Sequence, residues 1–318
     1  MREFINTSFR TYIHFIKGEK EMEEYYWDHK MEYLKRTRDL YYNDDYLEFL
    51  VRYVWKVNNP VNIIDFGCGY GYMGLKLLPL LPLGSTYTGI DKGQQLINEA
   101  RELFQHLPYE TDFIIADLND YKIGRKYDIA VCHAFLLHVT EPKNILQKML
   151  DCLVNEGRII CFEPHWISSM SSNHLRGYEQ SHIFPLSSLQ KLYEADKNQK
   201  GKDGNIGAKI PIYLGELGVK NIECRISDKV NFLHPNMDQK EKQKLYESLI
   251  EDGMGNEPTD KGAFINSLIN RGLSLSEAQK QYEAELLFSQ VFNKDSSLIF
   301  APGMKITFGV KEKNDLVD

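Results

Sequence analysis

The sequence predicts a doubly wound α/β fold built on a mostly parallel sheet. Strand-like and helical segments alternate between residues 62 and 163. The strand-like segments are apolar along their whole length, as in NIIDF (62–66) and RIICF (158–162), which is typical of parallel strands covered on both faces. A glycine-rich turn, GCGYG (67–71), follows the first strand and precedes a helix, and such a turn lets a ligand approach the backbone closely.

A helical segment is predicted ahead of this alternation. Residues from about 19 to 57 combine aromatic and charged side chains at helical spacing. One apolar face is expected to contain Tyr46, Phe49, Leu50, Tyr53 and Val54. The sequence NNP at 58–60 ends the helix.

The alternating part is predicted element by element. Strands are expected at 62–66, 86–90, 112–116, 128–133 and 157–163. Helices are expected at 71–81, 94–105 and 145–153. This order is that of consecutive strand-helix-strand units.

The regular alternation of strands and helices ends after Glu163. Loops are expected at 168–173, which is rich in serine, and at 197–207, which is polar and rich in glycine. Helices are expected at 186–195 and 208–217, and strands at 219–226 and 305–310. Residues 235–297 are predicted to be helical, and Ser274 with Glu277 has the spacing of a capping box.

The length of 318 residues allows one large domain or a domain with an appendage. We divide the chain into an N-terminal helical segment (1–57), an α/β core (58–234), a helical insertion (235–303), and a last strand with a C-terminal tail (304–318). A net charge of -7 argues against broad binding to nucleic acid or to anionic membranes, which needs basic surfaces.

Cysteine usage and apolar runs indicate the compartment. The five cysteines form no C-x-x-C pair, which favours reduced thiols in a cytoplasmic protein over disulfides or a zinc site, and no metal is expected. The first 20 residues are broken by Arg, Asn, Thr and Lys, so we expect no signal peptide. No apolar run is long enough to span a bilayer.

The glycine-rich turn fits two different adenosine cofactors. From Gly69 it reads G-x-G-x-x-G, the dinucleotide pattern, in which the turn presents a helix N-terminus to a pyrophosphate. From Gly67 it reads G-x-G-x-G with Asp65 two residues ahead. A carboxylate there suits S-adenosylmethionine (SAM), which has no phosphate but has an ammonium group that the carboxylate can counter.

Acids at the next two strand ends separate the cofactors. Asp91 ends the second strand, where a carboxylate can accept hydrogen bonds from both ribose hydroxyls of either cofactor. Asp117 ends the third strand, where a carboxylate can accept from the adenine amino group while the N–H of Leu118 donates to the ring. This third acid is expected for SAM and not for NAD.

With IIDFGCGYG, TGIDK, IIADL and YDIAVC in this order, the sequence resembles the class I SAM-dependent methyltransferases from about residue 45 to 230. Residues 305–310 would be the last strand of that family's seven-stranded sheet. The sequence departs from the family at Asn155-Glu156-Gly157, where a second glycine is usual, and at Gly93, which replaces a common serine. The resemblance implies that SAM is the cofactor and S-adenosylhomocysteine (SAH) the product.

The resemblance also assigns residues to the cofactor. Asp65, Gly67 and Gly69 would hold the methionine end, with Cys68 as a small side chain in the same turn. Asp91 would hold the ribose, the stem of Lys92 would lie against adenine, and Asp117 with Leu118 would read the adenine. The alternative for Asp65 and Asp117 is ordinary capping of strand ends.

Candidates for catalysis follow the fourth and fifth strands. His133 could reach the methyl donor or the acceptor as a base, or could contact the methionine end of the cofactor instead. Glu163 and His165 form a possible acid/base pair, and the alternative is a hydrogen-bonded strand terminus. His138 is expected to pack, and Trp166 could stack on a flat acceptor.

Two segments outside the core could cover the site. An aromatic cluster, Tyr25-Tyr26-Trp27-Asp28 with Tyr33, precedes the core. The resemblance implies that this segment could fold over the cofactor, as N-terminal segments of the family often do, and the alternative is an amphipathic helix packed on the sheet. Residues 235–295 carry 7 Lys/Arg and 11 Asp/Glu, a net charge of -4, which suits a lid over a small acceptor better than a nucleic-acid clamp. Gly253 and Gly255 are possible hinges, and a dimerisation element is the alternative.

The sequence thus predicts a methyltransferase that acts on an O or N atom of a small molecule, as a monomer or homodimer. A tRNA or protein methyltransferase is the alternative within the fold. A SAM- or SAH-binding protein without activity and a nicotinamide oxidoreductase are the alternatives from other classes.

Overall fold

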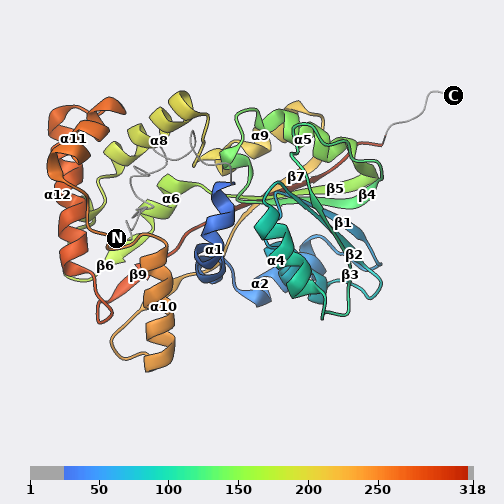
Figure 1. The fold of residues 1–318 in the computed structure, drawn as a ribbon, viewed down its shortest axis with the longest axis horizontal. Helices are drawn as coiled ribbons and strands as arrows, with labels where there is room; N and C mark the ends of the chain where they lie inside the picture. Colours follow the sequence, from blue (N-terminus) through green and yellow to red (C-terminus); the bar gives the residue numbers. More distant parts are fainter. Residues whose placement is uncertain (1–24, 314–318) are drawn as a thin grey trace.

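A computed structural model describes residues 25–313, so the predictions for residues 1–24 and 314–318 lie outside the described residues. The molecule has a larger lobe around an extended sheet and a smaller, mainly helical lobe at the other end (Figure 1). No helix among the described residues is both long and apolar enough to cross a membrane.

The larger lobe contains a seven-stranded sheet in the order β3-β2-β1-β4-β5-β10-β7. Its strands are β1 (Asn62–Phe66), β2 (Thr86–Asp91), β3 (Glu110–Ile115), β4 (Tyr127–His133), β5 (Leu153–Glu163), β7 (Lys220–Ile226) and β10 (Lys305–Val310). Only β10 runs antiparallel to its neighbours in this sheet of the described chain. The predicted doubly wound, mostly parallel fold is confirmed.

Helices cover both faces of the central strands. The core helices are α3 (Tyr72–Leu77), α4 (Gln94–Phe104), α5 (Pro142–Asp151) and α9 (Ile210–Glu216). Residues on both faces are buried at 63–66 of β1 and 159–163 of β5, which explains why these stretches are mainly apolar. Strand order reverses between β1 and β4, and such a switch point leaves a crevice at the carboxyl ends of the strands.

The helical segment before the core differs from its predicted face. It comprises a 3₁₀ turn (Tyr26–Lys30), α1 (Met31–Thr37), a 3₁₀ turn (Arg38–Leu40), α2 (Asp44–Phe49) and a π-helical turn (Leu50–Val54). Phe49 and Tyr53 are 46% and 67% exposed, so the expected apolar face is wrong at these positions. Within α2 and the π-helical turn, the buried residues are Leu47, Leu50 and Val51. In the π turn the N–H of Trp55 donates to the carbonyl of Leu50, and this wider repeat displaces the buried face from helical spacing.

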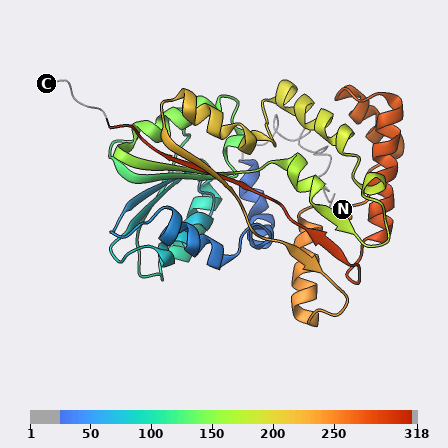
Figure 2. The ribbon, with the colours of Figure 1, turned by 180° about the vertical axis from the view of Figure 1, so that it is seen from behind.

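The smaller lobe contains a second sheet that the sequence did not predict. Its strands β6 (Asn173–Leu175), β9 (Leu298–Phe300) and β8 (Asn231–Leu233) pair antiparallel in the order β6-β9-β8. β10 follows β9, and β8 follows β7, so the chain passes directly from one sheet to the other (Figure 2). The smaller lobe is therefore joined to the core by more than one chain crossing.

The serine-rich segment 168–173 was expected to be a loop, and this prediction is wrong. It forms most of the helix α6 (Trp166–Ser171) and the start of β6. The hydroxyls of Ser171 and Ser172 both donate to the carbonyl of Ser168, so the serines bond to their own turn of backbone. Serine composition alone does not reveal this arrangement.

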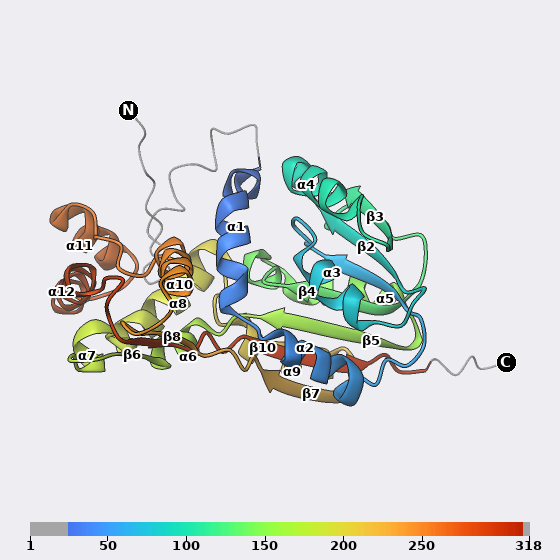
Figure 3. The same ribbon diagram turned by 90° about the horizontal axis from the view of Figure 1, so that it is seen from below.

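The remaining helices complete the smaller lobe. They are α7 (Gln180–Ile183), α8 (Leu186–Lys200), α10 (Gln239–Glu251), α11 (Lys261–Asn270) and α12 (Leu275–Val291). α8 extends through the first part of the loop expected at 197–207, and Gly201 in left-handed conformation ends it. The helical prediction for 235–297 and the Ser274–Glu277 capping box are confirmed. α1 lies between the two lobes (Figure 3).

Candidate active site

The glycine-rich turn after β1 forms the floor of the site. Gly67 and Gly69 have φ angles of +70° and +54°, a left-handed conformation that favours glycine. The ring of Phe135 packs directly on Gly67, where an added Cβ would lie 2.3 Å from Cδ2 of that ring. At Gly69 an added Cβ would meet no atom within 4 Å among the described residues. The two glycines thus have the same backbone requirement but different steric surroundings.

Asp91, at the end of β2, fixes the shape of this turn. Its Oδ2 accepts a hydrogen bond from the N–H of Gly69 at 3.0 Å, and its Oδ1 accepts from the N–H of Gly93 at 2.8 Å. Burial raises the pKa of this carboxyl above its usual range. Asp91 therefore both faces the cleft and connects the glycine turn to the start of α4.

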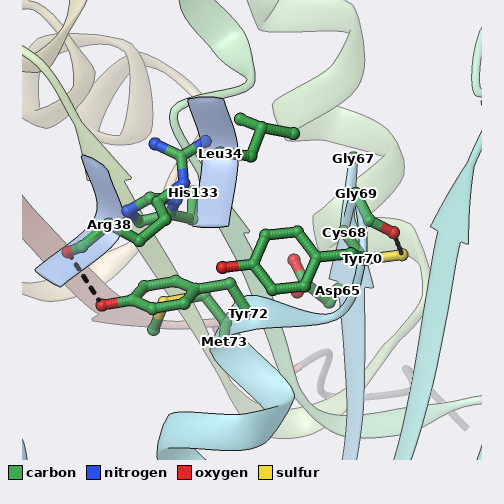
Figure 4. A pocket seen from close by; sticks show the side chains of 10 residues that line it. All are labelled: Leu34, Arg38, Asp65, Gly67, Cys68, Gly69, Tyr70, Tyr72, Met73 and His133. Carbon is green, nitrogen blue, oxygen red and sulfur yellow. Dashed lines mark hydrogen bonds between the residues drawn. The ribbon is translucent and has the colours of Figure 1, made fainter. Parts of the chain in front are cut away.

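A small pocket, called the inner pocket below, lies between the turn and α1 (Figure 4). It is lined by Leu34, Arg38, Asp65, Gly67, Cys68, Gly69, Tyr70, Tyr72, Met73 and His133. Asp65 is 1% exposed, and its Oδ2 accepts from the hydroxyl of Tyr87 at 2.5 Å. Its Oδ1 has no partner within residues 25–313, and burial raises the pKa of the carboxyl to about 7. An unpartnered buried carboxyl oxygen suits a ligand that donates hydrogen bonds, such as an ammonium group.

Arg38 brings the opposite charge to the same pocket. Within residues 25–313, its side chain forms neither an ion pair nor a hydrogen bond. A guanidinium and a carboxyl group that line one small pocket match the carboxylate and the ammonium of an amino acid end. No motif in the sequence identifies Arg38 as a site residue, because it lies 27 residues before Asp65 on a different element.

His133 and Cys68 complete the inner pocket. His133 is buried against the rings of Tyr42, Tyr72 and Phe162, and its Nε2 has no partner among the described residues. Burial, together with the charge of Arg38, holds the pKa of His133 well below its usual range. Burial also raises the pKa of the Cys68 thiol well above its usual range, so Cys68 is not a reactive thiolate.

A wider pocket, called the outer pocket, adjoins the inner one at Gly67. Its lining residues are Tyr25, Gly67, Asp91, Lys92, Ala116, Asp117, Leu118, Asn119, Phe135, His138, Val139, Thr140 and Ile145. Its empty volume of about 690 Å³, including the part open to solvent, is in the range of small-molecule sites. Asp117 is exposed and its Oδ1 accepts from the backbone of Asn119, while Leu118 is buried. The predicted strand-end residues Asp91, Lys92, Asp117 and Leu118 thus come together in one pocket.

The N-terminal segment covers this outer pocket. Asp28 accepts hydrogen bonds from the N–H groups of Gln95 and Leu96, both at 3.0 Å, and so caps the start of α4 from a distant segment. The ring of Tyr25 lies 4.7 Å from Nζ of Lys92, at the rim of the pocket. The tie between Asp28 and α4 therefore holds the aromatic segment against the cleft.

A third pocket, called the aromatic pocket, lies on the other side of Arg38. It is lined by Trp27, Tyr33, Arg38, Tyr41, Ala134, Leu137, His138, Pro164, Trp166, Ser169 and Met304. It shares Arg38 with the inner pocket and His138 with the outer pocket. Ala134, directly after β4, has a φ of +47°, a strained conformation for a residue with a side chain that is often found at functional sites.

Glu163 and His165 do not line any of these three pockets. The fully buried carboxylate of Glu163 accepts from the N–H groups of Phe135, Leu136 and Leu137 at 3.0, 2.9 and 3.4 Å. This is the hydrogen-bonded strand terminus that the sequence offered as the alternative. His165 begins α6, and burial lowers its pKa. His133 is the only one of the three predicted catalytic residues that these pockets include.

Comparison with known proteins agrees with this geometry. The family described as "Methyltransferase domain" matches residues 58–253, more than half of the chain. A malonyl-acyl-carrier-protein O-methyltransferase from Acetivibrio thermocellus is 26% identical over 36% of this chain and 39% of its own length. A tRNA (guanine-N(7)-)-methyltransferase from Schizosaccharomyces pombe is 30% identical over 46% of this chain and 49% of its own length. The chain thus spans less than half the length of these curated relatives.

Among solved structures, a SAM-dependent methyltransferase from Geobacter sulfurreducens in complex with SAH has a TM-score of 0.47 and 13% sequence identity, with 90% of this chain and 98% of that chain covered. The match to the family over residues 58–253 includes every strand end that forms the inner and outer pockets. The chain belongs to the class I SAM-dependent methyltransferase family, whose cofactor is SAM.

Proposed function

We propose that this protein transfers a methyl group from SAM to an O or N atom of a small-molecule acceptor held in the aromatic pocket. The observation that carries this proposal is that the aromatic pocket adjoins both cofactor pockets, through Arg38 and His138. Its empty volume of about 590 Å³, including the part open to solvent, suits a small molecule.

The cofactor would lie along the inner and outer pockets. In the inner pocket Asp65 would accept from the ammonium of the methionine end, Arg38 would pair with its carboxylate, and His133 would contact the same end. In the outer pocket Asp91 would accept from the ribose, while Lys92, Asp117 and Leu118 would surround the adenine. When bound, SAM supplies a methyl group on a positively charged sulfur.

The protein's own part in such a reaction is alignment and exclusion of water. Ala134 and Leu137 line the acceptor side directly after β4, and Trp27 with Trp166 offers aromatic faces for a flat acceptor. Holding two reactants in line can supply a large part of a rate enhancement, about 7–11 kcal/mol of a barrier in favourable cases. These walls would therefore determine both the acceptor's orientation and its size.

Closure by the insertion supports a small acceptor over a nucleic acid. α10 packs against α1, and Met304, between β9 and β10, lines the aromatic pocket. We propose that the insertion 235–303 forms a lid over this pocket, and an acidic lid of net charge -4 over residues 235–295 is unfavourable for a polyanion. A dimer contact by the same helices is the competing outcome.

The proposed function is tested by incubating the protein with methyl-labelled SAM and, separately, the small-molecule and RNA fractions of the source organism. We expect label in a small molecule, and we expect calorimetry to show binding of SAH and no binding of NADH. Label found in RNA or protein would show that the acceptor is a macromolecule and not a small molecule. Binding of SAH without any label transfer would indicate a non-catalytic SAM-binding protein. Light scattering at the same concentrations reports the oligomeric state.

A further inference from the structure

A buried tyrosine–aspartate pair lies on the wall of the aromatic pocket. Tyr41 lines the pocket and is 5% exposed. Its hydroxyl donates to Oδ1 of Asp252 at 3.1 Å. Asp252, at the end of α10 in the insertion, is 1% exposed, and its Oδ2 has no partner among the described residues. The insertion thus contributes a carboxyl group directly behind an acceptor-pocket residue.

This arrangement is costly if it serves only to connect two elements. A buried polar atom without a partner is unfavourable by about 1–3 kcal/mol, and more for a charged group. An asparagine or an apolar side chain would connect α10 to residue 41 without a buried acid. A buried carboxyl with a free oxygen next to a ligand pocket is typical of a functional group.

Asp65 also has a free carboxyl oxygen, but it lines only the inner pocket, where it is assigned to the cofactor's ammonium group. The other candidate acids and bases near the aromatic pocket are less suited to take a proton. Burial lowers the pKa of His138 to about 3 and that of His133 well below its usual range, so both are weak bases. Glu163 is occupied by three backbone N–H groups and, like His165, lines none of the three pockets. Tyr41 with Asp252 is the remaining pair that has both access to the pocket and a place for a proton.

We propose that the Tyr41 hydroxyl, supported by Asp252, takes the proton of the acceptor during methyl transfer. This inference rests on the proposed function. The acceptor's O–H bond breaks and its proton passes to the Tyr41 oxygen, while the hydroxyl proton of Tyr41 passes to the Asp252 carboxylate. The electron pair left on the acceptor oxygen forms the new bond to the methyl carbon. The bond between that carbon and sulfur breaks, and its electron pair stays on sulfur.

Arg38 narrows the acceptor class to a hydroxyl compound. Its guanidinium lines the same pocket as Tyr41, without an ion pair in residues 25–313. Besides the pair with the cofactor's carboxylate, the guanidinium has N–H donors left that can stabilise the charge developing on an acceptor oxygen as it loses its proton. It has no acceptor atom to offer an ammonium group. Together with the rings of Trp27 and Trp166, this favours a flat molecule with an acidic hydroxyl.

The groups that face Asp252 indicate how this step depends on pH. They are the buried Tyr41, the half-buried Tyr33 and the Arg38 cation, which favours the carboxylate. Burial outweighs this attraction and raises the pKa of Asp252 to about 7. The carboxylate that accepts the proton is therefore present above about pH 7, and we expect the transfer rate to rise with pH through this value.

The test compares Asp252→Asn and Tyr41→Phe with two controls outside the site. Glu251→Gln makes the same charge change one residue away on an exposed position, and Tyr53→Phe removes the hydroxyl of an exposed tyrosine. Label transfer is measured from pH 6 to 9 with a saturating amount of the accepting small-molecule fraction. We expect each site variant to lose at least about a hundredfold in rate. Binding of SAH should stay within a factor of three, and the controls should match the wild type.

The outcomes separate the possible failures. If both site variants keep the wild-type rate and its rise with pH, the pair is only a connection between α10 and residue 41, and the inference is wrong. Label on an amine would overturn the acceptor class. If the intact protein transfers no label although it binds SAH, the proposed function fails and this role fails with it. If Asp252→Asn does not fold, as judged by SAH binding, the rate of Tyr41→Phe alone tests the inference. That variant deletes a single oxygen and leaves the ring in place.

Discussion

Gly67 and Gly69 offer a direct test of what the glycine turn requires. Alanine at either site must adopt a positive φ, which costs about 1–2 kcal/mol. Only Gly67→Ala also places a methyl group against the ring of Phe135. We expect urea denaturation to show a loss of about 1–2 kcal/mol for Gly69→Ala and a larger loss for Gly67→Ala. Equal losses would show that Phe135 can move aside without cost.

Asp91 is expected to contribute to both binding and folding. Its removal deletes two hydrogen bonds to backbone N–H groups, each worth about 1.5–3 kcal/mol for a charged acceptor, and the proposed bonds to ribose. Calorimetry of Asp91→Ala should therefore show SAH affinity reduced at least tenfold, and chemical denaturation should show a clear loss of stability. This loss of stability cannot be predicted from the sequence, because the bonds to Gly69 and Gly93 depend on the folded turn. Normal SAH affinity in the folded variant would contradict the assignment of Asp91 to the ribose.

At the residue scale, the sequence predicted the cleft residues that directly follow strands of the sheet. Asp65, Asp91 and Asp117 follow strands that can be identified from composition, and the carboxyl ends of these strands meet at one edge of the sheet. Arg38 and Asp252 could not be predicted, because each reaches its pocket from an element whose packing depends on tertiary contacts alone. Nothing in the spacing of Tyr41 and Asp252, 211 residues apart, indicates that they touch.

The start of α4 depends on a cap from a distant segment. Asp28→Ala leaves the N–H groups of Gln95 and Leu96 without their acceptor, which should cost about 0.5–2 kcal/mol. Because this tie also holds Tyr25 at the outer pocket, we expect weaker SAH binding as well. Asp238→Ala is the matched control, since Asp238 caps α10 by the same kind of bond, far from the outer pocket. Calorimetry on both variants should show reduced SAH affinity only for Asp28→Ala.

At the element scale, hydrophobic periodicity identified the long helices and strands. The wrong predictions arose where the local backbone departs from a regular repeat or where a strand is very short. The predicted face over Phe49 and Tyr53 assumes a regular repeat, but a π turn interrupts it. Residues 168–173 look like a loop because serine competes with helical backbone, yet here the hydroxyls bond within the helix. The three-residue strands β6, β8 and β9 are too short to give an alternating pattern.

The contribution of Glu163 to the stability of the molecule should fall as pH rises from about 4.5 to 7. Burial raises the pKa of Glu163 to about 7 from its usual 4.5, so the folded protein binds this proton more tightly than the unfolded chain. The stabilisation is fully present below about pH 4.5 and is lost as pH rises through 7. Urea denaturation at pH 5 and pH 8 should show a smaller difference for Glu163→Gln than for the wild type. Glu102→Gln, at an exposed position of α4, should behave as the wild type does.

The overall architecture was predictable as far as the larger sheet extends. The seven-stranded, mostly parallel sheet with residues 305–310 as its last strand follows from the family resemblance, and it is confirmed. The strand order and the antiparallel direction of β10 come from the structure alone. The smaller lobe was predicted as helices alone, but it also contains a sheet that continues from the chain around β7 and β10. Gly253 and Gly255 lie between α10 and α11, inside this lobe, so they cannot by themselves hinge the lobe against the core.

The position of β10 between β5 and β7 affects how the protein can fold while it is being synthesised. A ribosome releases β5 and β7 long before residues 305–310, and in the finished sheet neither strand contacts the other directly. Until residues 305–310 emerge, the nascent chain keeps an open strand edge on β5 and leaves β7 without its neighbour. Chains that stop before residue 305 should therefore aggregate or be degraded, even though every proposed cofactor ligand is already present in them.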